Sequence, residues 1–202
     1  MKKKKEKINL GNFFEEQYKI SFSYIKESKN FIYFAILVFF AFVILGFLIQ
    51  LPPNLNSQIL DYFHRLVEET QGFGWIDLIT FIFSNNLLSG FMGLFFGVIL
   101  GIFPFFSSAA NGFMVGFAAS LSVSKEGIFS LWRLFPHGIF ELPAIFISFG
   151  LGLKLSTFLG YKEKWKTLRK FIEKSVSVYI FVIIPLLVVA AIIEGTLIFF
   201  GV

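Results

Sequence analysis

The sequence predicts an all-α membrane protein: a polytopic helical bundle with about five transmembrane helices and additional amphipathic surface helices. Of the 202 residues, 56% are hydrophobic and 15% are charged, whereas soluble domains average about 45–50% apolar and about 25% charged. The mean hydropathy of +0.76 agrees with this interpretation. The chain contains 31 Phe and no Cys, so disorder, a disulfide scaffold, a cysteine zinc module and thiol redox chemistry are excluded.

Residues 1–30 are polar, and we interpret them as a basic tail on the cytoplasmic side. A basic tip, Lys2 to Lys5 and Lys7, precedes Asn12 and Glu15, whose spacing suits the start of a helix. Apolar residues then recur at roughly helical spacing: Phe13, Phe14, Tyr18, Phe22 and Ile25. We expect an amphipathic helix that lies along the membrane surface. The alternative is a flexible tail that only sets the topology.

Residues 31–202 are expected to form a single transmembrane domain. The predicted spans are about 31–50, 86–103, 105–123, 136–154 and 176–200. The first contains no charge and is long enough, at 1.5 Å per residue, to cross a hydrocarbon core of about 30 Å.

Between the first two spans, the pattern predicts surface structure. Pro52 and Pro53 end the first span, and Ile59, Phe63, Leu66 and Val67 place an apolar face on a surface helix over about 55–70. Because Asp77 interrupts the next apolar stretch, we expect an interfacial piece at 75–84, with Asn85 and Asn86 at its junction with the second span.

Two proline-containing segments set the limits of the next spans. Gly101 to Pro104 predicts a tight turn into the third span. Pro136 is expected in the first turn of the fourth span, where its missing N–H costs nothing.

Lys and Arg are distributed unevenly, which predicts the orientation. The N-terminal tail holds eight of them and the 154–174 segment holds seven, against three in the other loops. With five spans, the positive-inside rule places the N-terminus in the cytoplasm and the C-terminus outside the cytoplasmic (cell) membrane. This topology explains the pI of about 9.4 without nucleic acid. The lipid bilayer, including anionic headgroups, is the expected partner of the basic residues.

Small residues repeat along the second and third predicted spans. They are Gly93, Gly97 and Gly101 on the second and Gly112 and Gly116 on the third. Glycines on one face let helix backbones approach closely, so we expect these two helices to pack against each other. A glycine-lined permeation path and a homodimer face are the alternatives.

Several polar residues lie inside predicted spans, where unpaired polar groups are costly. His137 and Glu141 are four residues apart on one helical face and can hydrogen-bond to each other. We predict a polar cluster of His137, Glu141 and Glu194 near the outer surface, with Asn85 and Asn86 nearby. Asn111 belongs to the same set of intramembrane polar residues, at a deeper level.

This cluster has three interpretations: a hydrogen-bond network that fixes helix register, a proton- or ion-linked transport site, or a site that binds a partner segment or lipid. Enzymatic activity is not expected. The sequence from His137 to Glu141 is not a zinc-protease motif, and neither a nucleophile elbow, a P-loop nor a dinucleotide fingerprint is present. We expect no cofactor and no metal.

The order of these polar motifs resembles a known family. The motifs are Asn85-Asn86, Asn111-Gly112 with Gly116, the Pro-His-Gly-x-x-Glu stretch from Pro136 to Glu141, and Ile193-Glu194-Gly195. Across residues 12–200 the chain is similar to the stage II sporulation protein M family of integral membrane proteins. The resemblance implies a five-span protein whose sporulating members hold cell-wall-degrading enzymes at the division septum.

From the residues and the resemblance together, we expect a non-enzymatic membrane scaffold that organises partner membrane proteins. The Lys- and Phe-rich composition without cysteine fits an archaeal member of the family. In a source without spores or peptidoglycan, only the fold and a scaffold or transport-linked role carry over. The alternative function is a transporter or channel component, such as a proton-, ion- or lipid-linked permease subunit.

Overall fold

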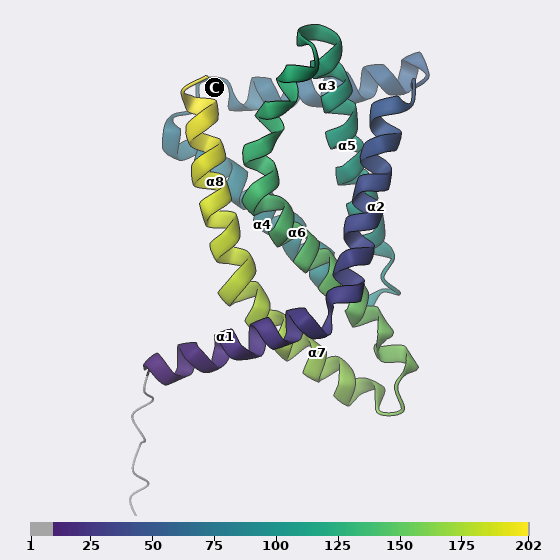
Figure 1. The fold of residues 1–202 in the computed structure, drawn as a ribbon, viewed down its shortest axis with the longest axis vertical. Coiled ribbons are helices and arrows are strands. Elements are labelled where there is room, and N and C mark those ends of the chain that lie inside the picture. Colours follow the sequence, from purple (N-terminus) through teal and green to yellow (C-terminus); the bar gives the residue numbers. More distant parts are fainter. Residues whose placement is uncertain (1–9, 202) are drawn as a thin grey trace, which may run out of the picture.

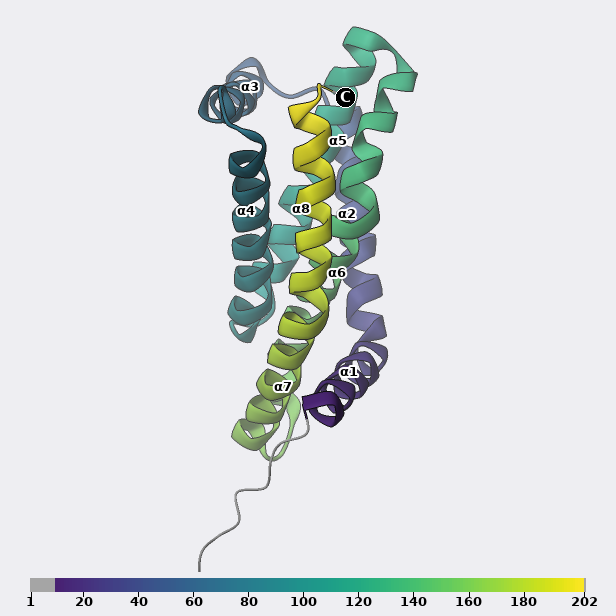
Figure 2. The ribbon, with the colours of Figure 1, turned by 90° about the vertical axis from the view of Figure 1, so that its left-hand side faces the viewer.

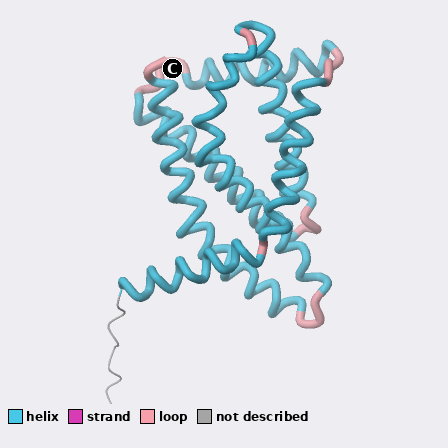
Figure 3. The backbone as a smooth tube through the Cα atoms, in the orientation of Figure 1, coloured by secondary structure: helices cyan, strands magenta, loops and turns pink. Residues whose placement is uncertain are grey.

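The computed structural model describes residues 10–201, except for the side chains of residues 133–137, and this part of the chain contains helices and no strand (Figure 3). Five of its helical segments are long and apolar enough to cross a membrane. The predicted all-α membrane bundle is therefore confirmed. The basic tip formed by Lys2 to Lys5 and Lys7 lies outside the described residues.

The chain begins with two surface helices that flank the first span (Figures 1 and 2). Helix α1 (Leu10–Glu27) lies across one end of the bundle, which we call the basal end. Helix α2 (Lys29–Leu48) runs from there to the opposite, distal end. Helix α3 (Pro53–Thr70) lies across the distal end and starts at Pro53, whose fixed φ suits a first helical position.

The next three spans alternate in direction. Helix α4 (Trp75–Phe95) runs back toward the basal end and finishes in a 3₁₀ turn, Phe96–Val98. Helix α5 (Ile102–Glu126) returns to the distal end, where a 3₁₀ segment, Ile128–Leu134, leads into helix α6 (Phe135–Ser156). Since α6 begins at Phe135, Pro136 lies in its first turn, as its sequence position predicts.

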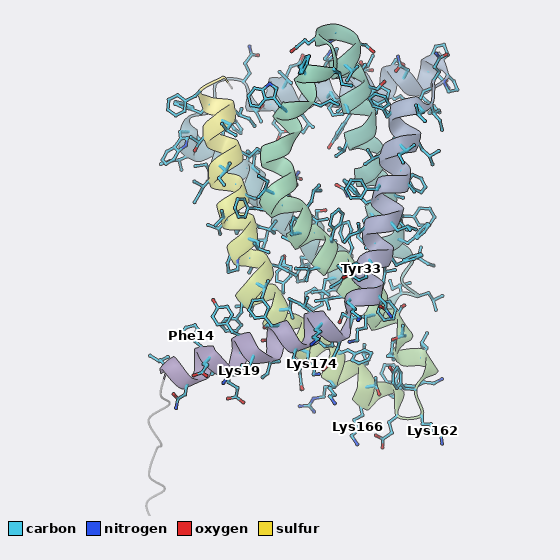
Figure 4. The ribbon with its side chains drawn as sticks, in the orientation of Figure 1. Phe14, Lys19, Tyr33, Lys162, Lys166 and Lys174 are labelled. Carbon is cyan, nitrogen blue, oxygen red and sulfur yellow. The ribbon has the colours of Figure 1, made fainter. Side chains whose placement is uncertain are left out.

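The last span is continuous with a helix at the basal end. After a 3₁₀ turn at Thr157–Gly160, helix α7 (Lys164–Val178) continues through a π-helical segment, Tyr179–Ile183, into helix α8 (Ile184–Phe199). Pro185 has no N–H for the carbonyl one turn earlier, which accounts for the widened turn before it. Both α1 and the basic segment around α7 therefore lie at the basal end (Figure 4).

The amphipathic helix of the tail starts earlier than its sequence pattern predicts. The backbone is already helical at Leu10, so Asn12 lies inside α1 and does not cap its start. Aromatic residues of α1 pack edge-on around Phe181 of the π-helical segment: Phe13, Phe14 and Tyr18. These contacts hold α1 against the foot of the last span.

The predicted second span, 86–103, is wrong at both ends. The structure has one span from Trp75 to Val98, with no interfacial break at 75–84 and no junction at Asn85 and Asn86. The physical reason is Asp77, whose Oδ2 accepts a hydrogen bond from the backbone N–H of Gly74, 3.0 Å away. Its charge caps the helix start and does not have to enter the hydrocarbon core.

The turn that follows α4 also comes earlier than predicted. The chain reverses at Ile99 to Gly101, where Leu100 and Gly101 both have a positive φ, of 53° and 67°. Pro104 then lies in the first turn of α5, where the helix requires no N–H from it.

Helix α6 is the centre of the bundle. In its most apolar stretch 61% of the residues are buried, against 22–39% in the same stretches of the other four spans. Phe149, Leu151 and Leu155 are fully buried in it. The outer face of α2 exposes large apolar side chains instead, as a lipid-facing surface does: Tyr33, Phe34, Leu37, Phe40 and Ile44.

Glycines on α4 and α5 allow direct contacts between helix backbones, but not with each other. A Cβ added at Gly112 would collide with the Phe39 carbonyl of α2, and one at Gly116 with the Val43 carbonyl. A Cβ added at Gly97 would collide with the backbone of Gly152 in α6. The predicted packing of the second span on the third is therefore wrong in its partners, because the second packs on α6 and the third on α2.

Two further glycines of the predicted set serve different purposes. A Cβ on Gly93 would collide with the Phe149 ring of α6, whereas Gly101 forms the positive-φ turn before α5 and lies outside the helix face.

We expect Gly116→Ala to lower the stability of the bundle because the added methyl group would meet the carbonyl of Val43. Overpacking of this kind costs about 1–3 kcal/mol. Gly90→Ala is the matched control, since its Cβ would find its nearest atom at 3.6 Å, an ordinary contact. Thermal unfolding in detergent measures both variants. Equal midpoints for the two would contradict the close α2–α5 contact.

Candidate functional site

Four of the predicted polar residues line one cavity of about 360 Å³ below α3. Asn85 and Asn86 come from α4, Glu141 from α6 and Glu194 from α8. The last turns of α3 supply Leu66, Val67 and Thr70 to the same cavity. The structure thus brings together predicted residues that are up to 109 positions apart in the sequence (85 to 194).

Glu141 is the most buried acidic group of this cavity, with 5% of its surface exposed. Its Oε2 accepts a hydrogen bond from Nδ2 of Asn86, which ties α6 to α4. A buried carboxylate requires such donors, and hydrogen bonds to a charged acceptor are stronger than neutral ones. Two residues further along α6, Pro143 has no N–H to donate to the carbonyl of Ile139.

Glu194 reaches the cavity because α8 lies very close to α4 at this level. A Cβ added at the neighbouring Gly195 would be 2.8 Å from a side-chain carbon of Ile79 in α4. Nε1 of Trp75 also donates a hydrogen bond to Oγ1 of Thr196, at 2.9 Å. The start of α4 and the end of α8 are therefore held together around Glu194.

The cavity combines hydrogen-bond acceptors with apolar walls. Two carboxyl groups, two amides and one hydroxyl line it, and the remaining lining residues are apolar: Leu66, Val67, Leu78, Phe81, Ile82 and Ile198. Among the described residues that line it there is neither Lys nor Arg. Such a site suits water, a proton or a hydrogen-bond-donating group. Within the described part of the chain, no group of three or more His, Asp and Glu is arranged to hold a metal ion.

The two remaining members of the predicted cluster are His137 and Asn111. The backbone of His137 lies in the first turn of α6, but its side chain lies outside the described residues. Asn111 is exposed on α5 and donates to the carbonyl of Ser107 on its own helix, at 2.8 Å. Its place in the cluster is therefore wrong, because the face of α5 that packs inward is the one that carries Gly112 and Gly116.

The sequence of this chain matches a family described as Stage II sporulation protein M over residues 35–197. The chain belongs to this family. It is also similar to two uncharacterized proteins of Methanocaldococcus jannaschii. One is 31% identical over 188 residues, which cover 86% of this chain and 83% of that protein. The other is 34% identical over 123 residues, which cover 56% of this chain and 66% of that protein. No solved structure matches.

Family membership confirms the recognition made from the polar motifs. In this member of the stage II sporulation protein M family, three of those motifs meet at the cavity, through Asn85, Asn86, Glu141 and Glu194. The fourth motif, Asn111-Gly112, serves the contact between α5 and α2 instead.

Sequence reasoning missed a second polar group at the basal end, which we call the basal cluster: Tyr24, Glu27, Ser28, Lys154 and Lys174. Lys154 of α6 is only 7% exposed. Its Nζ donates to Oγ of Ser28 at 3.0 Å and lies 4.1 Å from the centre of the Tyr24 ring. The one signal in the sequence is its position at the end of an apolar span, where the apolar stem of a Lys can pack against the protein.

Glu27 joins the cationic groups of the basal cluster. Nζ of Lys174 in α7 donates to both of its carboxylate oxygens at 3.1 Å, and Nζ of Lys154 lies 3.8 Å from Oε2. Partial burial alone would raise the pKa of Glu27. The hydrogen bond and charge of Lys174, with the charges of Lys154 and Lys170, outweigh it and hold this pKa below its ordinary value. The cluster therefore links α1, α6 and α7 electrostatically.

Acid should loosen α1 from the basal end. A carboxylate with a lowered pKa in the folded state stabilises the fold fully above its unfolded pKa, about 4.5, and this contribution disappears as the pH falls through the lower folded value. We expect hydrogen exchange of residues 10–28 to accelerate below about pH 4.5 by more than the intrinsic exchange rate explains. Glu27→Gln should remove this pH dependence. Glu15→Gln, in an exposed pair with Lys19, should keep it. Identical pH profiles for both variants would contradict the role of Glu27.

Proposed function

We propose that this protein is a non-enzymatic scaffold that organises partner proteins in the cell membrane, with α1 and α7 on the cytoplasmic side. The observation that carries the proposal is the backbone contact between helices at the glycine positions. Gly112 and Gly116 lock α5 onto α2, and Gly97 with Gly152 locks α4 onto α6. Transport by alternating access requires parts of a bundle to rock against each other. Tightly packed backbones oppose such motion and favour a fixed framework.

The surface helix α3 is the part of this framework best placed to meet a partner. None of its residues is buried, and it lies across the distal end (Figure 1). One contact to the bundle is the stacking of Phe63 on Phe117 of α5, with ring centres 6.3 Å apart. Its exposed side carries charged residues: Asp61, Arg65, Glu68 and Glu69. A helix held outside the spans in this way can bind another protein without disturbing the bundle.

Crosslinking from α3 in native membranes tests the scaffold role. Because the chain has no cysteine, Glu68→Cys introduces a single reactive thiol on an exposed site. We expect a discrete adduct with one partner protein, identified by mass spectrometry and reproduced when the partner carries the tag. Leu37→Cys, on the lipid-facing side of α2, is the control and should give no such adduct. Failure to find a partner above this control would contradict the scaffold role.

A transport-linked function is the second candidate, and the cavity of about 360 Å³ that reaches Glu141 and Glu194 favours it. Two carboxyl groups in one partly polar cavity could exchange protons with water that enters below α3. In the scaffold proposal the same groups have a structural role, in which Glu141 holds α4 through Asn86.

Proton flux in lipid vesicles separates these two functions. From the scaffold proposal we expect vesicles with the purified protein to dissipate a pH gradient no faster than empty vesicles. Glu141→Gln keeps an oxygen for Asn86 and should stay folded, whereas Glu141→Leu leaves the amide unpaired and should lose about 1–2 kcal/mol of stability. Glu69→Gln, on the exposed side of α3, is the control. A flux that disappears in Glu141→Gln and persists in Glu69→Gln would contradict the scaffold proposal.

A further inference from the structure

Helix α4 has a second polar face, on the side away from α6 and α8. Its inner side carries Gly90, Gly93 and Leu94, which are buried. Its outer side exposes a row of polar residues at helical spacing, Asp77, Thr80 and Ser84, with the exposed Asn85 at the edge that borders the cavity below α3. In Figure 2, α4 stands at the edge of the bundle. The polar row therefore lies on a surface that lipid would cover in a single copy of the chain.

The middle of this row lies deep in the membrane. Asn85 is ten residues after Trp75, the first residue of the helix, which places it about 15 Å along the span. Asp77 caps the helix start, and the Thr80 hydroxyl donates to the carbonyl of Ile76, at 2.8 Å. By contrast, the side chains of Ser84 and Asn85 have no hydrogen-bond partner among the described residues of the chain.

Lipid tails offer no hydrogen bonds, so an exposed amide near the bilayer centre is costly until another protein group pairs with it. The exposed side of α2 shows what this protein presents to lipid, because Tyr33, Leu37 and Ile44 are large and apolar there. The polar row on α4 does not follow that pattern. It has the composition of a contact between transmembrane helices, in which small and amide-bearing residues predominate.

We propose that this outer face of α4 binds the same face of α4 in a second copy of the chain. A two-fold axis along the membrane normal places each residue of such an interface near its own counterpart. An Asn side chain both donates and accepts hydrogen bonds, and a Ser hydroxyl does too, so both pair with themselves. Self-complementary groups, with Ser84 within the row and Asn85 at its edge, fit a second copy of this chain better than an unrelated helix.

The geometry of the row also supports this occupant. Ser84 is small enough to let two helices approach closely at that point. With the crossing point there, the two Asp77 side chains lie more than a turn away, near the membrane surface, where water screens their repulsion. The row itself lines an open hollow of about 630 Å³, together with Phe73, Phe81 and Leu88, and this hollow leaves room for side chains of the second copy.

The glycine face of α4 does not compete with this role, since α6 already occupies it. The homodimer considered from the sequence is therefore assigned to the opposite side of the same helix. This inference does not depend on the scaffold function, because self-association through α4 is compatible with either candidate function.

Cysteine crosslinking of the purified protein in phosphatidylcholine vesicles tests the proposal. Ser84→Cys places one thiol at the expected crossing point of a chain that has no cysteine. We expect mild oxidation to give a disulfide-linked dimer on a non-reducing gel. Leu37→Cys is the control, because Leu37 is 65% exposed on the lipid-facing side of α2. A dimer yield from Ser84→Cys no higher than from Leu37→Cys would overturn the proposal.

A second measurement keeps the cysteine out of the interface. Energy transfer between labelled copies, followed as lipid dilutes them, gives the dissociation constant of the dimer. We expect Asn85→Leu to raise this constant by about three- to twenty-fold, which corresponds to the loss of a membrane hydrogen bond. Leu37→Ala should leave it unchanged. An unchanged constant in Asn85→Leu would overturn the proposal, as would native membranes in which Ser84→Cys joins a different protein and never a second copy.

Discussion

The parallel contact between α4 and α6 is the interaction on which the rest of this structure depends. The backbones touch where a Cβ on Gly97 would meet Gly152 and where a Cβ on Gly152 would meet the carbonyl of Gly93. Two turns toward the distal end from Gly93, on the same face of α4, Asn86 donates to Glu141. Between these points, Ser148 of α6 donates to the carbonyl of Gly90, at 2.5 Å. The glycines let α4 and α6 approach closely toward the basal end, and this approach fixes the positions of Asn86 and Glu141 toward the distal end.

The helical class, the number of spans and the grouping of basic residues at one end follow from the sequence. They depend on the length of uncharged stretches and on the distribution of charge, which are local properties of the chain. The choice of neighbour is not local. A run of glycines identifies a face that another backbone can approach, but not which backbone, and so the partner predicted for Gly93 and Gly97 is wrong. Asp77 shows the same limit in another form, since the sequence shows a charge in an apolar stretch but not that a helix begins just before it. The proximity of Asn86 and Glu141 could be predicted because polar groups inside membrane spans need hydrogen-bond partners.

Helix α6 is held near both ends by buried side chains of charged residue types, which on hydrophobicity alone would not be expected inside a bundle. Glu141 bonds to α4 near the distal end, and Lys154 near the basal end contacts Ser28 and the ring of Tyr24. Both side chains are over 90% buried, so each loses stability if its partner moves away. The burial of Lys154 could not be predicted, because a Lys at the end of a span satisfies the positive-inside rule whether its side chain is exposed or buried. Lys154 is buried because α1 packs beside it and brings Tyr24 and Ser28 into contact with its amine.

Asn85 and Asn86 show how one helix can serve two contacts. Successive residues on a helix point about 100° apart, so the two amides point in different directions. Asn86 turns inward to Glu141, while Asn85 lies at the boundary between the cavity below α3 and the exposed row on α4. A group that covers the outer face of α4 therefore also borders the cavity that contains Glu141 and Glu194. Asn85 and Phe81 line both the cavity and the hollow along the exposed row, so a partner bound at the outer face of α4 would change the surroundings of the cavity.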